Sequence, residues 1–112
     1  MSRLITQEMA QAAFDWLASN SDDVAQARGA AIRAEYRVKK IMAKEFLKAE
    51  GSVEVRKATA TCSAEYDSAC EDHASADANW ERLKDQRNKF ELLIEAWRTQ
   101  ASNERGLVRA TR

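Results

Sequence analysis

The chain has 112 residues, no proline and 32% charged residues, and its length allows one small domain. No apolar run in the sequence is long enough to cross a membrane. Eighteen basic residues balance eighteen acidic ones, so net charge does not decide whether nucleic acid is a partner. Apolar and polar residues do not alternate over any long stretch, which favours helices over sheets. A chain this short buries a modest core, so we expect self-association.

The N-terminal stretch and the two cysteines indicate a soluble cytosolic protein. Residues 1–6 lack the long apolar core of a signal peptide. Cys62 and Cys70 lie on one predicted helix, about 12 Å apart along its axis, which is too far for a disulfide. Free thiols fit a reducing compartment.

The first predicted helix spans about residues 7–19 and begins after Thr6, a suitable N-cap. Its apolar residues form one wide stripe: Met9, Ala10, Ala13, Phe14, Trp16 and Leu17. The polar run 19–23 then predicts a break, because Ser, Asn and Asp side chains compete for backbone hydrogen bonds.

The second predicted helix spans about residues 22–50. Its apolar face holds mainly small residues that allow a partner helix to approach closely: Val24, Ala27, Ala31, Ala34, Val38 and Ile41, followed by Met42, Phe46 and Ala49. Gly29 costs about 1 kcal/mol of helix propensity, but the flanking alanines should carry the helix through. Gly51 should then end the helix and Ser52 should cap the next one.

The third predicted helix, about residues 52–105, carries a heptad pattern for about six heptads. One core position takes Val55, Cys62, Ala69, Ala76, Leu83, Phe90 and Trp97, and the other takes Thr59, Tyr66, His73, Trp80, Arg87, Ile94 and Ala101. Gly106 should end this helix and leave residues 106–112 as a basic tail.

The short turn at Gly51 predicts an all-α antiparallel coiled-coil hairpin with a very long C-terminal helix and a short N-terminal helix. In such a hairpin, residues at about equal sequence distances from Gly51 face each other, which places Val38 near Cys62 and Val24 near Trp80. The second half of the long helix is left for the N-terminal helix, from the same chain or exchanged, and for further copies. The expected oligomer core is Trp80, Leu83, Arg87, Phe90, Leu93, Ile94 and Trp97, with Leu92 widening the face.

Two polar features have both a structural and a functional interpretation. Cys70, His73 and Asp77 share a helix face, with Cys62 two turns earlier, so a dimer could assemble a tetrahedral metal site. The simpler interpretation is that His73, like Arg87, is a polar core residue that fixes register. We therefore expect no metal and no cofactor.

Basic residues form two groups. The first is a stripe on the second helix, Arg33, Arg37, Lys40, Lys44 and Lys48, which could follow a phosphate backbone or could pair with acids of the third helix, bringing Arg37 near Glu65. The second group lacks such compensation and is the predicted contact for nucleic acid or a partner: Arg82, Lys84, Lys89, Arg98, Arg105 and Arg109.

No motif predicts catalysis. The chain has no glycine-rich phosphate loop and no nucleophile elbow, and its single histidine has no Ser or Cys placed at a surface to be activated by it. We expect a non-catalytic protein without a small-molecule substrate.

Three segments resemble small coiled-coil proteins of tailed phages and prophages: 35–40 (EYRVKK), 45–53 (EFLKAEGSV) and 94–100 (IEAWRTQ). Such proteins are often encoded among early recombination and replication genes, and the resemblance implies an accessory protein in DNA metabolism. Two hypotheses follow: an oligomeric factor that assists recombination through single-stranded DNA or a DNA-bound partner, or a protein–protein module that inhibits or adapts a host enzyme without binding nucleic acid.

Overall fold

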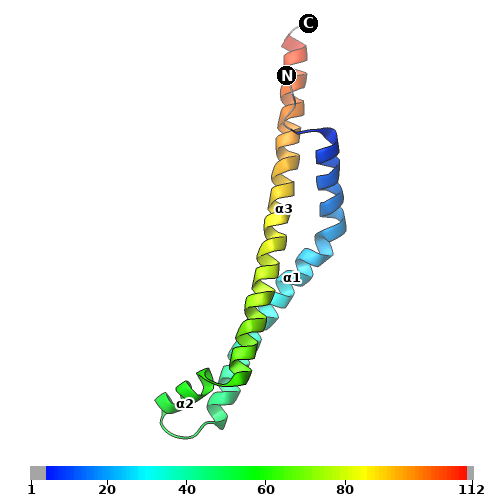
Figure 1. Cartoon of the computed structure of the whole chain (residues 1–112). Coiled ribbons are helices and arrows are strands. Elements are labelled where there is room, and N and C mark those ends of the chain that lie inside the picture. Colours follow the sequence, from blue (N-terminus) through cyan, green and yellow to red (C-terminus); the bar gives the residue numbers. More distant parts are fainter. Residues whose placement is uncertain (1–4, 111–112) are drawn as a thin grey trace. The chain divides into compact units, whose positions relative to one another are not determined.

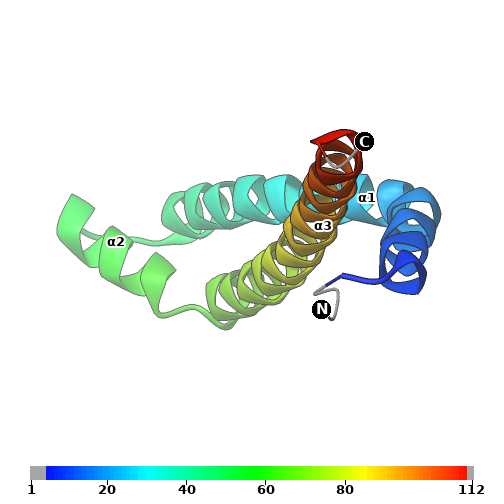
Figure 2. The ribbon, with the colours of Figure 1, turned by 90° about the horizontal axis from the view of Figure 1, so that it is seen from above.

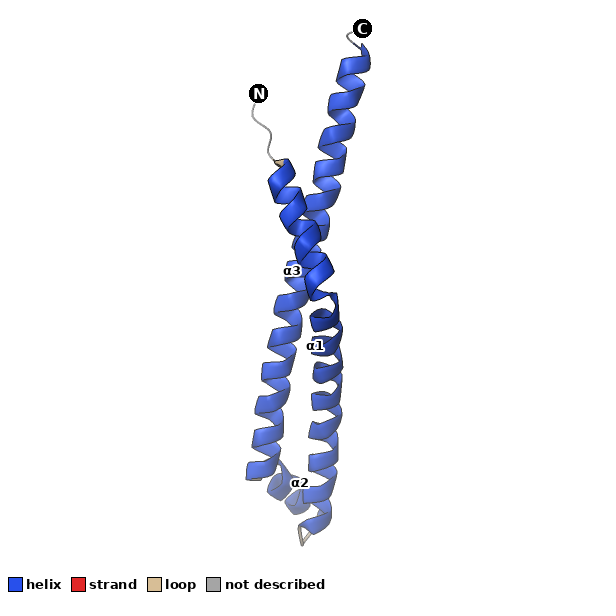
Figure 3. Ribbon diagram, turned by 90° about the vertical axis from the view of Figure 1, so that its right-hand side faces the viewer, coloured by secondary structure: helices blue, strands red, loops and turns tan. Residues whose placement is uncertain are grey.

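The computed structural model describes residues 5–110 as three helices. In chain order they are α1 (Gln7–Lys48), α2 (Val53–Thr61) and α3 (Ala64–Ala110), as Figure 1 shows. Within these residues there is no strand (Figure 3). The predicted all-α hairpin with a very long C-terminal helix is confirmed. The first residues of the lead and the last two of the tail lie outside the described range.

The predicted break at residues 19–23 does not form, so the separate short N-terminal helix is wrong. α1 continues through this run for 42 residues. The side-chain amide of Asn20 donates to the Trp16 carbonyl at 2.9 Å, a bond back along the helix that leaves the backbone ladder intact. Asp22 and Asp23 are exposed, and the next residue, Val24, is only 4% exposed. The polar side chains therefore face solvent while packing holds the helix.

The caps of α1 and α2 lie where the sequence predicts them. Thr6 Oγ1 accepts from the backbone N–H of Met9 at 3.1 Å. Gly51 has a φ of 110°, the left-handed conformation that glycine adopts without strain. Ser52 Oγ accepts from the N–H of Val55 at 3.3 Å and opens α2.

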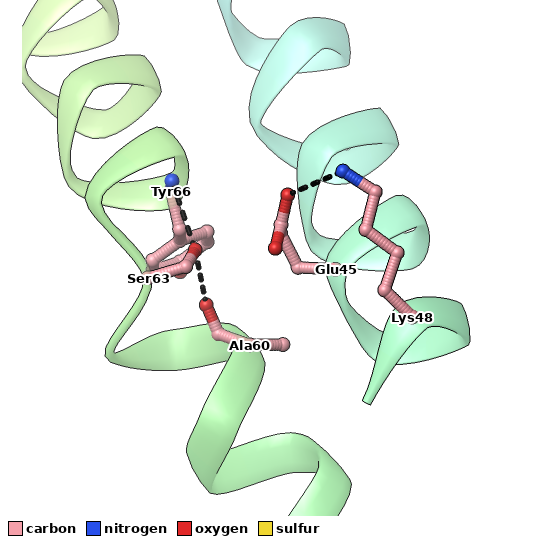
Figure 4. A network of polar contacts seen from close by, with 5 residues as sticks. All are labelled: Glu45, Lys48, Ala60, Ser63 and Tyr66. Atoms are coloured by element: carbon pink, nitrogen blue, oxygen red, sulfur yellow. Dashed lines mark hydrogen bonds and ion pairs between the residues drawn. The ribbon is translucent and has the colours of Figure 1, made fainter. Parts of the chain in front are cut away.

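A second break, between α2 and α3, was not predicted. Near the end of α2, the hydroxyls of Thr59 and Thr61 each donate at 2.8 Å to the carbonyl four residues back, a pattern that weakens a helix. Ser63 Oγ then donates to the Ala60 carbonyl at 2.8 Å and accepts from the Tyr66 N–H at 3.2 Å (Figure 4). Ser63 thus closes α2 and caps α3. The third helix does not begin at residue 52.

The predicted end of the long helix at Gly106 is also wrong, since α3 continues to Ala110. A glycine ends a helix when it takes a positive φ, and in residues 5–110 only Gly51 does so. Arg109 in the last turn interacts favourably with the helix dipole.

The chain divides into two compact units. The tip unit comprises residues 24–82, and the terminal unit comprises the described residues 5–23 and 83–110. In the tip unit the guanidinium of Arg28 lies 5.2 Å from the ring centroid of Trp80, and Arg37 pairs with Asp72 at 3.1 Å. Later residues of α1 therefore meet earlier residues of α3, which is antiparallel pairing. Figure 2 shows that α2 connects α1 to α3 at the end of this unit.

The terminal unit pairs the first part of α1 with the last part of α3 in the same antiparallel sense. Gln100 donates from its side chain to the Ile5 carbonyl at 2.8 Å, and the Ile5 N–H donates back to Gln100 Oε1 at 3.4 Å. The rings of Trp16 and Phe90 lie 5.1 Å apart at 35°. The N-terminal segment therefore packs against α3 of the same chain.

The predicted heptad face is confirmed along α3. Every expected position from Tyr66 to Ala101 is buried or half-buried, whereas Val55, Thr59 and Cys62 are exposed. α2 takes these three residues away from the α3 axis, and its nine residues lengthen the turn. Arg37 accordingly meets Asp72 and not Glu65, a shift of one heptad from the predicted register.

Gly51→Ala and Gly29→Ala should change stability in opposite directions. A side chain at Gly51 is strained by the positive φ and would meet Val55 Cγ1 at 3.2 Å, so we expect a loss of about 1–2 kcal/mol. Gly29 lies inside α1, and its added Cβ would meet only the flexible end of Arg33 at 3.0 Å, so we expect a gain of about 0.5–1 kcal/mol. Urea unfolding followed by circular dichroism measures both; changes of the same sign would contradict this account.

Candidate interaction surfaces

The basic residues predicted as contacts do not form one patch. Arg82 belongs to the tip unit and donates to the side chain of Asn79 at 2.9 Å. In the terminal unit Lys84 is half-buried, and the Lys89 ammonium lies 5.6 Å from the ring centroid of Phe90. Nine residues separate Lys89 from Arg98, which places them on roughly opposite sides of a helix. Lys89 therefore does not extend the surface of the later arginines.

Three of the predicted residues do share one side of α3. Arg98, Arg105 and Arg109, here called the arginine stripe, are all exposed, and their spacing of seven and four residues places them within an arc of about 40°. α1 starts level with Gln100, to which Ile5 bonds, so two of the three lie beyond the start of that helix. The stripe presents three rigid cationic forks to solvent, a geometry that suits phosphate oxygens.

Two of the residues predicted as an oligomer core contact α1 of the same chain, since Trp80 lies beside Arg28 and Phe90 beside Trp16. Leu83 and Ile94 are buried, at 8% and 6% exposure, while Trp80, Arg87, Phe90, Leu93 and Trp97 are half-buried. Leu92, which was expected to widen this face, is 64% exposed. No large side chain among residues 5–110 is fully buried. Whether a second copy covers the partly exposed rings stays a prediction.

The basic stripe of the second predicted helix now lies on the later part of α1. Its one ion pair to α3 in the described residues is Arg37–Asp72, and both side chains are 58% exposed. Lys48 instead pairs with Glu45 of its own helix at 3.4 Å (Figure 4). Exposed pairs contribute about 0–1 kcal/mol each, so the predicted charge pairing of the hairpin exists but adds little stability.

The candidate metal ligands are not assembled within one chain. No group of three His, Cys, Asp or Glu side chains that could hold a metal occurs in residues 5–110. Cys62 is exposed outside α3, and His73 is half-buried on the heptad face. The thiol of Cys70 hydrogen-bonds the Tyr66 phenol and raises the pKa of Tyr66 above its ordinary value of 10.0, with burial and the Asp67 carboxylate acting in the same direction.

One surface was missed by the sequence. A hollow of about 590 Å³, here called the tip groove, lies between the end of α1 and α2 and is lined by Lys39, Met42, Ala43, Phe46, Leu47, Lys57 and Thr61. It exists because α2 leaves the axis of α3. The sequence signal for that departure was the run Thr59–Ser63, whose hydroxyl side chains compete with the helix ladder.

Comparison with protein-family models, with curated proteins and with solved structures found no match for the chain. Within residues 5–110, no helix combines the length and the apolar character needed to cross a membrane.

Proposed function

We propose that this chain is a non-catalytic, self-associating helical accessory protein of the phage type, which assists DNA recombination or replication in the bacterial cytoplasm by holding single-stranded DNA against the arginine stripe. The exposed set Arg98, Arg105 and Arg109 on one side of α3 carries the proposal. Each guanidinium can bind a phosphate with two parallel hydrogen bonds. Three such contacts on a straight helix suit a flexible strand that can follow them.

Self-association is supported by the thinness of the core. The buried apolar residues are mostly alanine, and aromatic side chains such as Trp16, Phe90 and Trp97 are only half-buried. Exposed apolar side chains in the terminal unit include Met9, Phe14, Leu92 and Leu107. Joining copies through these surfaces would remove apolar area from water at about 25 cal/mol per Å². It would also place several arginine stripes on one assembly.

Reversing the charge of the stripe should abolish DNA binding. The variant carries Arg98→Glu, Arg105→Glu and Arg109→Glu, and because all three side chains are exposed its helix content should change only at the last turn of α3, where Arg109 lies. The measurement is the fluorescence anisotropy of a labelled single-stranded oligonucleotide. For three phosphate contacts, the wild-type affinity should fall about 20-fold between ~50 and ~200 mM salt.

A matched control exists on α1. Arg33, Lys40 and Lys44 are exposed and have the same spacing as the arginine stripe. Reversing these three charges should leave most of the binding intact, although the net charge changes equally. Undiminished binding by the stripe variant would refute the proposal, and equal loss in both variants would reduce it to non-specific attraction.

The second candidate function is a protein–protein module, such as an inhibitor or adaptor of a host enzyme. It is favoured by Leu92, a large side chain 64% exposed on α3 beside the half-buried Leu93 and Trp97. In that case no oligonucleotide binding is expected at either salt concentration, and a host protein should be retained by the wild type but not by a Leu92→Glu variant.

A further inference from the structure

The tip groove combines an apolar floor with a basic rim. Met42, Ala43, Phe46 and Leu47 of α1 supply the apolar lining, and Lys39 and Lys57 stand at the two sides. No acidic residue lines it. Leu47 is 77% exposed, the largest exposure among the large apolar side chains of residues 5–110. An apolar side chain so exposed beside a hollow is typical of a binding surface.

A further positive group lies next to the floor. The guanidinium of Arg56 is 5.8 Å from the ring centroid of Phe46, and its Nε is buried without a hydrogen-bond partner. The Arg56 guanidinium has lost part of its hydration by lying against the ring, which costs free energy. An anionic group beside it would offset this cost, so the site favours an anionic neighbour.

The nearby acids do not neutralise the rim. Glu35 pairs with Lys39 at 3.8 Å on the open surface, a contact of the weakest class. Glu45 is turned to Lys48 on the same helix. Glu54 lies in the first turn of α2, where the helix dipole favours an acid. For Lys57 no ion pair is found with another described residue.

We propose that the tip groove is a docking site for a short acidic segment of a partner protein, which places one or two large apolar side chains on the floor and carboxylates beside Lys39 and Lys57. The size fits a segment and not a domain: on α1 the lining runs from Lys39 to Leu47, which is about 12 Å, or roughly two helical turns. A volume of about 590 Å³ is in the range of peptide-side-chain and ligand sites.

Other occupants fit less well. A bilayer meets flat or convex apolar faces, whereas this surface is a hollow between two helices. Nucleic acid would leave the apolar floor without a partner, because Arg56 lies over the Phe46 ring on which a base could stack. In the tip unit, the acidic part of α3 bears only small apolar residues on its exposed positions, namely Ala64, Ala74 and Ala78. A second copy offers exposed apolar residues beside acids, such as Leu92 between Glu91 and Glu95, and the sedimentation experiment below distinguishes it from a separate partner.

The test is selection of a displayed random peptide library on the immobilised full-length chain. We expect the enriched peptides to combine several acidic residues with a large apolar one. Their affinity should fall about tenfold or more for a Leu47→Glu, Lys57→Glu double variant, because both the floor contact and one charge contact are lost. The control double variant, Val53→Glu with Lys40→Glu, changes one exposed apolar residue and one exposed lysine of the tip unit that do not line the groove, and it should bind the peptides like the wild type.

Four outcomes of the binding experiments would overturn the proposal, and a fifth comes from sedimentation. They are a library without enrichment, enriched peptides that lack acids, peptides that bind the double variant unchanged, and association with phosphatidylglycerol vesicles in place of peptides. Loss of self-association by the Leu47→Glu, Lys57→Glu variant in sedimentation would assign the groove to a second copy instead. Oligonucleotide binding depends on the other unit, so its failure and the failure of peptide binding are distinguishable.

Discussion

Ile94→Ala should destabilise the terminal unit by about 2–4 kcal/mol and lower its melting temperature by roughly 10 °C or more. Ile94 is 6% exposed, and only Leu83 among the other large apolar residues of this unit is buried to a similar degree. Two helices cannot close readily around the lost methyl groups, because the other buried side chains facing them, Ala10 and Ala13, are already minimal. Thermal unfolding followed by circular dichroism measures the effect.

Leu92→Ala is the matched control for that prediction. Leu92 lies two residues before Ile94 on the same helix but is 64% exposed, so its truncation should stay within about 0.5 kcal/mol. Equal destabilisation by the two variants would mean that Leu92 is covered in solution, as the self-association hypothesis predicts for this face. A negligible effect of Ile94→Ala would contradict the pairing of α1 with α3 in the terminal unit.

The heptad face of α3 was predictable because large apolar side chains mark it at regular spacing. The heptad spacing of apolar residues identifies the side of α3 that faces inward. The residues at these positions are buried or half-buried, among them Trp80, Leu83, Phe90 and Ile94. The antiparallel sense followed from Gly51, whose positive φ is a local property of glycine. These features depend on neighbours in sequence, which a pattern can reveal.

The breaks were not predictable by the same logic. The run at residues 19–23 contains the residue types that end helices, yet its side chains lie in solvent or bond back to α1, and packing of Val24 and Ala27 maintains the helix. Cys62 and Ser63 fit the heptad count without a slip, yet the hydroxyl bonds of Thr59, Thr61 and Ser63 separate α2 from α3. Whether the side-chain or the backbone hydrogen bonds form at such a run depends on tertiary contacts.

The same distinction applies to the candidate surfaces. The arginine stripe was within reach of the sequence, because helical spacing alone places Arg98, Arg105 and Arg109 together. Grouping them with Lys89 ignored the direction of each side chain around the helix. The tip groove required knowing that α2 leaves the α3 axis, and of its lining residues only Thr61 belongs to the run of hydroxyl residues that marks this departure.

Ala69→Leu should destabilise the tip unit by about 1–3 kcal/mol although it adds apolar surface. Ala69 is 1% exposed and lies one turn before Asp72, close to where Arg37 brings α1 against α3, so a leucine must push the helices apart. Ala78→Leu is the control, because Ala78 is exposed on the same helix. Alanine and leucine have similar helix propensity, so little change in stability is expected. Urea unfolding followed by circular dichroism compares the two. A stabilising effect of Ala69→Leu would show that the helices have room to spare, which would contradict the close approach that Ala27, Ala31 and Ala69 allow.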